Sequence, residues 1–182
     1  MKKAVINHEM TAMLRELIGQ MFLSYDYASF FEEQVYGNLK INTEKFSIEL
    51  RNEIEEFPFY DTVEDISCFS CKKRLPEEPF TPYSQGEPIS KKEIHEKIRS
   101  VQIVNDTINV NQGEYQCSFD MAVIIHTTEH RYIFSRGWFF GETIDVNVDR
   151  RFDDIYSIQQ VIDDWSNDGE NEVVVKRSTK SL

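Results

Sequence analysis

The sequence predicts an α+β fold: N-terminal helices packed on an antiparallel β-meander of about four or five strands, with one helix inserted near the C-terminus. Three observations support this prediction. Apolar residues recur at three- and four-residue spacing in the first part of the chain, which is typical of a helix. Apolar and polar residues alternate over much of 101–149, which is typical of strands. All five prolines fall between Pro58 and Pro88, which predicts a connector between the two regions.

The first predicted helix covers residues 8–36. Asn7 is a suitable N-cap, and Gly37 followed by an asparagine is a stop signal. The apolar residues that would share one helical face are Met10, Met13, Leu14, Leu17, Ile18, Met21, Tyr25 and Ala28. Such a wide apolar surface predicts that this helix is largely covered.

Two further segments are predicted to be helical. Residues 43–57 fit either a helical face or strand alternation, and their length and charged residues favour a helix that Pro58 would stop. Ser90 and Glu93 form a capping-box pattern, which predicts a short helix ending near Arg99.

The period then changes to two. Residues 101–110 and 114–126 read as strands joined by a hairpin loop at 111–113 that contains a glycine. Residues 130–140 are expected to pair back on the second of these strands, and 143–149 to add another. The segment from the second strand to residue 140 is the densest apolar stretch of the chain and the expected centre of the fold.

The predicted organisation is a helical region at 1–57, a proline-rich irregular connector at 58–90, a sheet with its C-terminal helix at 91–177, and a loose tail at 178–182. The C-terminal helix is expected within 154–166, where apolar residues share one face, with Asp153 or Ser157 as its cap; a last strand is expected at 173–175. Together these parts are expected to form one compact domain.

Charge is distributed unevenly along this acidic chain, whose formal net charge is −12. Residues 142–172 contain ten acids and two bases, residues 1–66 are also strongly acidic, and 67–100 are slightly basic. Nucleic-acid binding needs clustered lysine and arginine, so direct DNA binding is not expected, nor is binding to an anionic membrane. The charge fits a partner protein that is itself basic.

Three cysteines do not make a disulfide framework, and the N-terminus lacks the apolar segment of a secretory signal, so a reducing cytoplasm is expected. Cys68 and Cys71 form a C-x-x-C pair that could bind zinc only if His126 and His130 completed the site. The simpler interpretation is two ordinary thiols, and two histidines that hydrogen-bond at a turn. A proton-transfer role for the histidines would need Glu129, the one acid between them.

Three carboxylates, Glu142, Asp145 and Asp149, suggest a second metal hypothesis. Asp145, Asn147 and Asp149 would share one face of a strand with Glu142 nearby, which would suit a hard cation such as Mg²⁺, as in a metal-dependent nuclease or hydrolase. The competing interpretation is the solvated face of an edge strand. The sequence has no nucleophile elbow, phosphate-binding loop or zinc-protease motif, which weighs against the common enzyme classes and leaves enzymatic activity uncertain.

The segment Arg136–Phe140 combines arginine with three large aromatic residues. Strand alternation sends Trp138 and Phe140 to one face and Phe139 to the other. An exposed tryptophan beside an arginine is typical of an interface anchor, whereas burial of all three rings would make the segment part of the core.

These patterns favour an acidic inhibitor that docks on the basic nucleic-acid-binding surface of a nuclease or effector. Toxin-immunity proteins and phage anti-defence or anti-CRISPR inhibitors work in this general way, by nucleic-acid mimicry. The expected binding residues are Glu142, Asp145, Asp149, Asp153, Asp154, Asp163, Asp164, Arg136, Trp138 and Phe139. The alternatives are the metal-dependent nuclease or hydrolase, a zinc-stabilised interaction domain, and a homodimer that buries Trp138.

Overall fold

Strands dominate the molecule: 58% of the described residues are in strands and 14% in helices. A computed structural model provides the structure and describes residues 1–31, 34–59, 62–83, 86–166 and 168–182. The predicted α+β fold, with N-terminal helices on a four- or five-strand meander, is therefore wrong. The described chain forms an 11-stranded, mainly antiparallel sheet instead.

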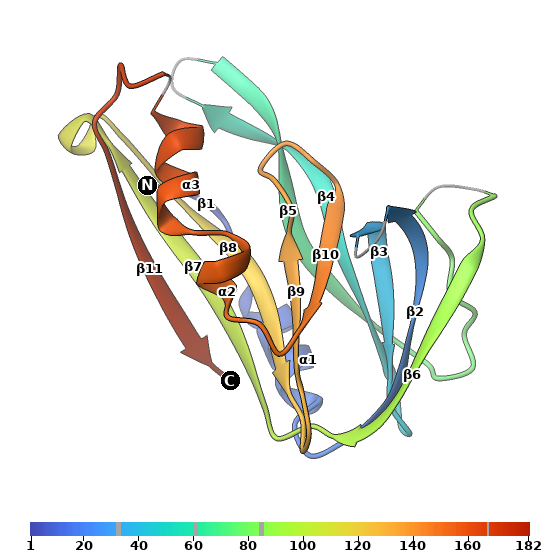
Figure 1. Cartoon of the computed structure of the whole chain (residues 1–182). Helices are drawn as coiled ribbons and strands as arrows, with labels where there is room; N and C mark the ends of the chain where they lie inside the picture. The colour runs from blue at the N-terminus through green and yellow to red at the C-terminus, as the bar shows by residue number, and fades with distance from the viewer. Residues whose placement is uncertain (32–33, 60–61, 84–85, 167) are drawn as a thin grey trace.

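The elements follow one another along the chain as shown in Figure 1. The strands are β1 (Lys2–Ala4), β2 (Met21–Phe31), β3 (Gln34–Asn42), β4 (Ser47–Phe59), β5 (Thr62–Arg74), β6 (Ile89–Lys97), β7 (Ser100–Val110), β8 (Tyr115–His126), β9 (Arg131–Arg136), β10 (Thr143–Val148) and β11 (Val173–Ser181). The helices are α1 (His8–Glu16), α2 (Phe152–Ile155) and α3 (Ile158–Trp165), with a 3₁₀ turn at Asn111–Gly113.

The sheet runs in the order β11-β7-β8-β9-β10-β3-β2-β6 and branches at β3. One part of β3, residues 34–36, pairs with β10, and another, residues 38–42, pairs with β4, which in turn pairs with β5. Strand β1 pairs with β8 in parallel; the other pairings are antiparallel. Because only Ile98 and Arg99 separate β6 from β7, the far end of the sheet connects directly back to its other side (Figure 1).

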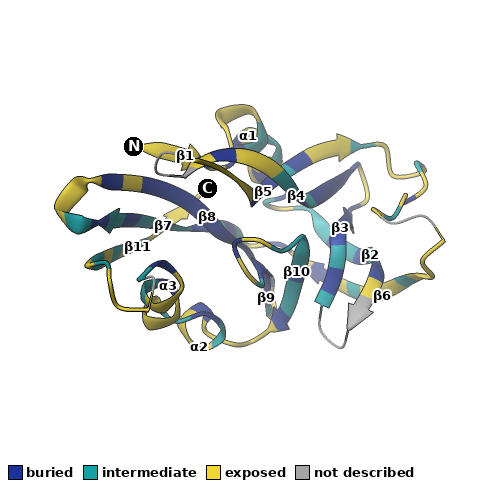
Figure 2. Cartoon of the chain, turned by 90° about the horizontal axis from the view of Figure 1, so that it is seen from above, coloured by how far each residue is buried: buried dark blue, intermediate teal, exposed yellow. Residues whose placement is uncertain are grey.

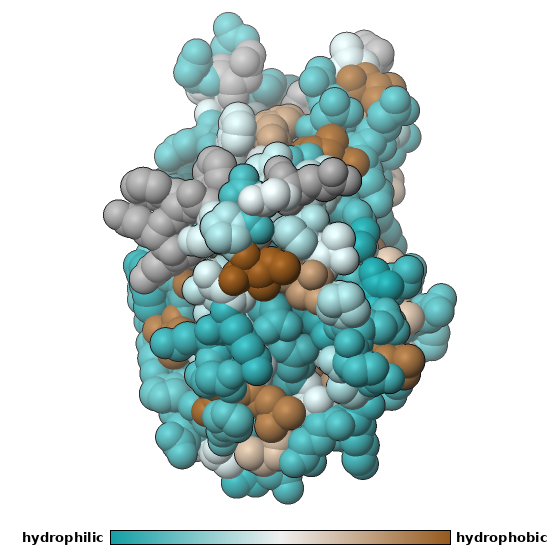
Figure 3. All heavy atoms as spheres, turned by 90° about the vertical axis from the view of Figure 1, so that its right-hand side faces the viewer, coloured by the Kyte–Doolittle hydropathy of each residue, from teal (hydrophilic) through white to brown (hydrophobic). Residues whose placement is uncertain are grey.

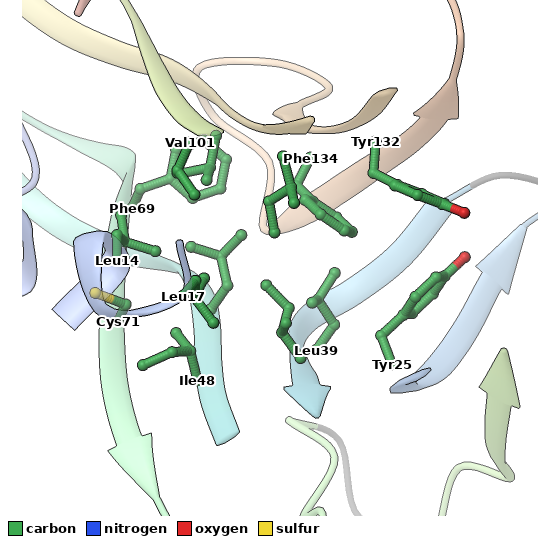
Figure 4. Close-up of a cluster of buried hydrophobic side chains, with 14 of the residues drawn as sticks. Leu14, Leu17, Tyr25, Leu39, Ile48, Phe69, Cys71, Val101, Tyr132 and Phe134 are labelled. Carbon is green, nitrogen blue, oxygen red and sulfur yellow. The ribbon is translucent and has the colours of Figure 1, made fainter. Parts of the chain in front are cut away.

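Helices cover both faces of strands β7–β9. Figure 2 shows α1 on one side of these strands and α2 and α3 on the other. One buried cluster, which we call the α1 core, contains Leu14 of α1 and Leu17, which follows this helix (Figure 4). The other, which we call the α3 core, contains Phe119 and Trp165. Strand β8 supplies residues to both, with Val123 in the α1 core.

The predicted helix over residues 8–36 is correct only for its first part. Asn7 does cap α1, because its side chain accepts a hydrogen bond from the Met10 amide at 2.9 Å. The chain then turns at Gly19, whose φ is +88°, and continues as β2 and β3. Strand β2 contains register shifts against both of its neighbours, for example between Phe22 and Ser24. Such bulges break the alternation of the sequence, so the apolar spacing of this strand resembled that of a helix.

The other two predicted helices are also strands. Residues 47–59 form β4 through pairing with β3 and β5. The alternation within 43–57 was therefore the correct signal, whereas its length and charged residues favoured a helix that does not form. The capping-box segment forms β6, which pairs with β2. In both cases pairing with distant strands overrides local helix propensity.

The predicted irregular connector at 58–90 contains β5, and its first proline lies inside β4. Pro58 lies beyond the part of β4 that pairs with β3, where a missing N–H is tolerated. The described residues between β5 and β6 contain the other four prolines and form no strand. The tail at 178–182 was predicted to be loose, but β11 extends to Ser181 and pairs along β7.

The strands predicted over 101–149 are confirmed, although one of them is shorter than expected. Strands β7, β8 and β10 match the predicted segments, as does the turn at Asn111–Gly113, whereas β9 ends at Arg136 and not at residue 140. The predicted C-terminal helix is two helices, α2 and α3. Ser157 caps α3, with the Gln160 amide donating to its hydroxyl at 3.2 Å.

A buried ion pair fixes β11 to β7. The Arg177 guanidinium donates to both carboxylate oxygens of Asp106, at 2.8 Å from Nε and 2.6 Å from Nη2. The Asp106 side chain is fully buried. Arg177 also donates to Asp153 at 2.8 Å and lies over the Phe152 ring, so one arginine ties β11 to both β7 and α2.

We expect Arg177→Ala to lower the free energy of unfolding by about 3–5 kcal/mol, because it leaves the Asp106 carboxylate buried without its partner. Chemical denaturation monitored by circular dichroism measures the change. Lys176→Ala, an exposed neighbour on the same strand, is the matched control and should change little. Equal destabilisation by the two variants would contradict this role of the ion pair.

Candidate functional site

The loop between β9 and β10, residues 137–142, is held by hydrogen bonds from β4 and β5. The Ser67 amide donates to the Phe139 carbonyl at 2.8 Å, and the Ser67 hydroxyl donates to the Trp138 carbonyl at 3.2 Å. The Asn52 side chain donates to the Gly141 carbonyl at 3.0 Å. Ser67 and Asn52 are both fully buried, so these donors have fixed positions and fix the loop in turn.

The aromatic residues of this loop point in opposite directions, as strand alternation predicts. Phe139 is fully buried, with its ring centroid 5.1 Å from that of Phe119 and 5.6 Å from that of Trp165. Trp138 is 50% exposed and Phe140 is 39% exposed, and their rings meet edge to face at 5.1 Å. A buried anchor therefore holds an exposed aromatic pair at the surface.

Glu142 ends the loop beside two tyrosines. Its carboxylate accepts hydrogen bonds from the Tyr36 hydroxyl at 2.7 Å and the Tyr83 hydroxyl at 2.8 Å. The bond from Tyr83 to Glu142 is the main cause that raises the pKa of Tyr83 to about 12. Gly37 permits this contact, because an added Cβ would lie 2.4 Å from the Tyr83 ring. We call Trp138, Phe140, Glu142 and Tyr83 the loop patch.

The carboxylates proposed for Mg²⁺ are not brought together. Asp145 accepts a hydrogen bond from the side-chain amide of Gln34 at 2.9 Å, near the loop end of β10. Asp149 follows the other end of β10 and lies beside His130 at 2.7 Å. Four residues along a strand span about 13 Å, which is too far for one ion. Glu142, Asp145 and Asp149 therefore do not form a common ligand set.

The four aspartates predicted on the C-terminal helix lie on α2 and α3 and are exposed. Asp153 pairs with Arg177, Asp163 accepts from the Gln159 side chain at 2.8 Å, and Asp164 accepts from the Tyr156 hydroxyl. We call Asp153, Asp154, Asp163 and Asp164 the helical acidic face. It lies on the side of the sheet opposite α1 (Figure 2). Phe139, which lies between the two exposed rings of the loop, packs on this side against Trp165 of α3.

Arg136 lies inside the protein and is only 1% exposed. The rings of Phe69, Phe119 and Phe139 surround its guanidinium at centroid distances of 5.4–5.8 Å. Burial lowers the pKa of Arg136 to about 10. Of the binding residues predicted at the Arg136–Phe140 end, Arg136 and Phe139 are thus interior supports, and Trp138 is the one that a partner can reach.

The four predicted zinc ligands are also separated. Cys68 and Cys71 lie three residues apart on β5, so they point to opposite sides: Cys68 lies in the α3 core and Cys71 in the α1 core (Figure 4). His126 hydrogen-bonds Gln102 at 3.0 Å, and His130 lies beside Asp149. A C-x-x-C pair can chelate one ion from a turn, but not across a strand.

Sequence reasoning missed Glu96 and the tyrosines that contact Glu142. Glu96 lay in a segment predicted to be helical, so nothing local indicated its approach to the β8–β9 turn. Among the described residues, the histidine, cysteine and acidic side chains close enough to share an ion are Glu96, Glu129 and His130.

Comparison of the chain with protein-family models, with curated proteins and with solved structures finds no match. None of the described helices is long and apolar enough to cross a membrane. Function is therefore inferred from the geometry of the chain itself. The surface over β2 and β6 is mostly hydrophilic with scattered apolar patches (Figure 3), which leaves the loop patch as the more distinctive candidate.

Burial raises the pKa of Cys68 to about 11 and that of Cys71 to about 12, and raises that of Cys117 as well. Because the thiolate is the reactive form, we expect all three thiols of the native protein to react slowly with an aromatic disulfide reagent at about pH 8. Absorbance of the released thiolate measures the rate, and the unfolded chain in denaturant is the control. Rapid labelling of Cys68 or Cys71 in the native protein would contradict their placement in the two cores.

Proposed function

We propose that this chain is a cytoplasmic acidic inhibitor that docks on a basic protein through the loop patch and the helical acidic face. The observation that carries the proposal is the exposed Trp138–Phe140 pair on a loop that β4 and β5 hold in place. Two neighbouring exposed aromatic rings leave apolar area in water, and a partner would remove that area from water on binding.

Rigidity makes this pair a suitable anchor. Tryptophan and tyrosine are enriched among the residues that dominate binding energies. A loop that must become ordered on binding loses part of the interaction energy, whereas the hydrogen bonds from Ser67 and Asn52 order this loop in advance. Phe139, which packs against α3 beneath the loop, prevents the exposed pair from collapsing inward.

Charge supports a basic partner. The chain carries a net charge of −12, and α3, which carries part of the helical acidic face, packs through Trp165 against Phe139 of the same loop that holds Trp138 and Phe140. Within that face Asp153 pairs with Arg177, and the contacts of Asp163 and Asp164 are with uncharged groups. Opposite potentials accelerate association and disfavour acidic partners, so such a face selects for a cationic surface.

A nucleic-acid-binding enzyme, such as a nuclease or an effector, is the partner class that we propose. Such enzymes carry grooves of lysine and arginine that bind phosphates, and exposed carboxylates can occupy the same groove. Aromatic rings beside the carboxylates add an apolar contact that the phosphate backbone lacks. Inhibition would then follow from competition with the nucleic acid for the groove.

We expect Trp138→Ala to weaken binding to the partner about 30-fold or more, because truncating a central anchor typically costs about 2 kcal/mol or more. The chain is immobilised, proteins captured from a lysate of its native host are identified by mass spectrometry, and the affinity of the captured basic protein is measured. Leu75→Ala is the matched control, since Leu75 is 57% exposed but lies outside the loop patch. Equal affinity of the Trp138→Ala and Leu75→Ala variants would overturn the proposal.

Two further measurements test the charge and the mode of action. Raising the salt from about 50 to about 500 mM should weaken the complex steeply, because screening removes the attraction between exposed charges. An affinity indifferent to salt would contradict the acidic docking. The purified partner should also lose nucleic-acid binding when the chain is added. If wild type is instead a dimer that Trp138→Ala converts to a monomer, the patch is a homodimer contact and the inhibitor proposal fails.

A further inference from the structure

At the end of β9 away from the loop patch, three segments that are distant in sequence come together. The β8–β9 turn closes through a hydrogen bond from the Thr127 amide to the His130 carbonyl at 2.9 Å. Asp149, directly after β10, is held there by its amide, which donates to the Arg131 carbonyl at 2.9 Å. Glu96, near the end of β6, reaches the same turn and accepts a hydrogen bond from the Thr127 hydroxyl.

Glu96 is a buried carboxylate with no lysine or arginine partner among the described residues. The residue is 7% exposed, and its carboxylate accepts hydrogen bonds from the hydroxyls of Thr127 and Tyr132, the latter at 3.1 Å. Within the part of the chain that the structure describes, its one ion-pair contact is with His130, at 3.8 Å. A buried charge that neutral hydroxyls alone support is costly, so this position favours a cation.

The His130 ring is oriented as a metal ligand would be. Its Nδ1 atom lies 2.7 Å from a carboxylate oxygen of Asp149, and Asp149 is itself fixed by the Arg131 amide at 2.9 Å. The ionised carboxylate accepts the Nδ1–H, so in the neutral ring the lone pair lies on Nε2. That nitrogen lies 3.8 Å from Oε1 of Glu96. Histidine ligands characteristically have such a carboxylate behind them, which fixes the tautomer.

Glu129 supplies the third donor. One carboxylate oxygen each from Glu96 and Glu129 and one ring nitrogen of His130 lie within 4.8 Å of one another. Donors of a tetrahedral zinc ion, bound at about 2.0–2.1 Å, are about 3.4 Å apart. The 3.8 Å between His130 Nε2 and Glu96 Oε1 is a few tenths of an ångström longer than that. Glu129 is exposed on the turn, so its side chain can adjust without moving the sheet.

We propose that Glu96, Glu129 and His130 bind a divalent transition-metal ion of the zinc class, with the fourth position open to water. One imidazole with two carboxylates suits Zn²⁺ or Mn²⁺ better than Mg²⁺ or Ca²⁺, which prefer oxygen donors alone. The ion would supply the positive charge that buried Glu96 lacks and would link β6 to the β8–β9 turn. This donor set excludes Cys68, Cys71 and His126, and it does not depend on the loop patch.

The test is to titrate zinc chloride into the chelator-treated protein. Calorimetry measures the binding, and the melting temperature measures the change in stability. We expect about one zinc ion per chain and a higher melting temperature, because an ion that binds the folded state stabilises it. Glu96→Gln and Glu129→Ala each remove a proposed ligand and should weaken zinc binding at least about tenfold. Even the loss of a contact that only orients a metal ligand weakens binding by about that much. His95→Ala should bind as wild type does, since His95 is exposed on β6 and pairs with Glu93.

Glu129 is exposed, so Glu129→Ala remains a test if Glu96→Gln fails to fold. Cobalt provides the second readout: the Co²⁺ form should show weak visible bands without the intense near-ultraviolet band of a cobalt–thiolate bond. Absence of zinc binding, or binding that survives both glutamate substitutions, would overturn the proposal. A thiolate band would also overturn it, by placing the metal on the cysteines. Loss of partner binding in Trp138→Ala leaves these results unaffected.

Discussion

The two-sided burial of β8 is the constraint on which the rest of the structure depends. Nearly every residue from Tyr115 to Ile125 is buried, so this strand needs an apolar layer on each face. Helix α1 with β2 and β3 contributes to one layer, α2 and α3 contribute to the other, and β4 and β5 supply residues to both. A strand buried on both faces reads as a continuous apolar run in the sequence, which is why this segment stood out as the centre of the fold.

The loop patch follows from the same constraint where β9 ends. Alternation continues past Arg136, so Phe139 fills the α3 core while its two aromatic neighbours face outward. Where the chain leaves the sheet, the loop carbonyls lose the hydrogen-bond partners that a neighbouring strand would supply. Ser67 and Asn52 donate hydrogen bonds to several of these carbonyls. The interactions that satisfy the backbone thus also immobilise the exposed rings, and this links the packing of the core to the proposed function.

How far the sequence predicts this molecule depends on whether a signal is local. Strands β7–β10 were predictable because alternation and a hairpin turn lie within a few neighbouring residues, and Ser157 was one of the two predicted caps. The capping-box pattern at Ser90 is just as local, but pairing with β2 makes that segment a strand. Strand β2 was not, because its bulges produce helix-like spacing. The exposure of Trp138 could be anticipated from alternation, whereas the meeting of Glu96 with His130 depends on strand order, which no local pattern encodes.

Three of the buried charged residues, Asp106, Arg136 and Glu96, are stabilised in three different ways. Asp106 has a bidentate arginine, and the Arg136 guanidinium lies among three phenyl rings that lower its desolvation cost through cation–π contact. Glu96 has two hydroxyl donors and one histidine. Asp106 already has the charge of Arg177 and Arg136 is enclosed by rings, whereas Glu96 borders a turn whose Glu129 and His130 are exposed. Of the three, Glu96 is therefore the one whose neutralising charge can come from solution.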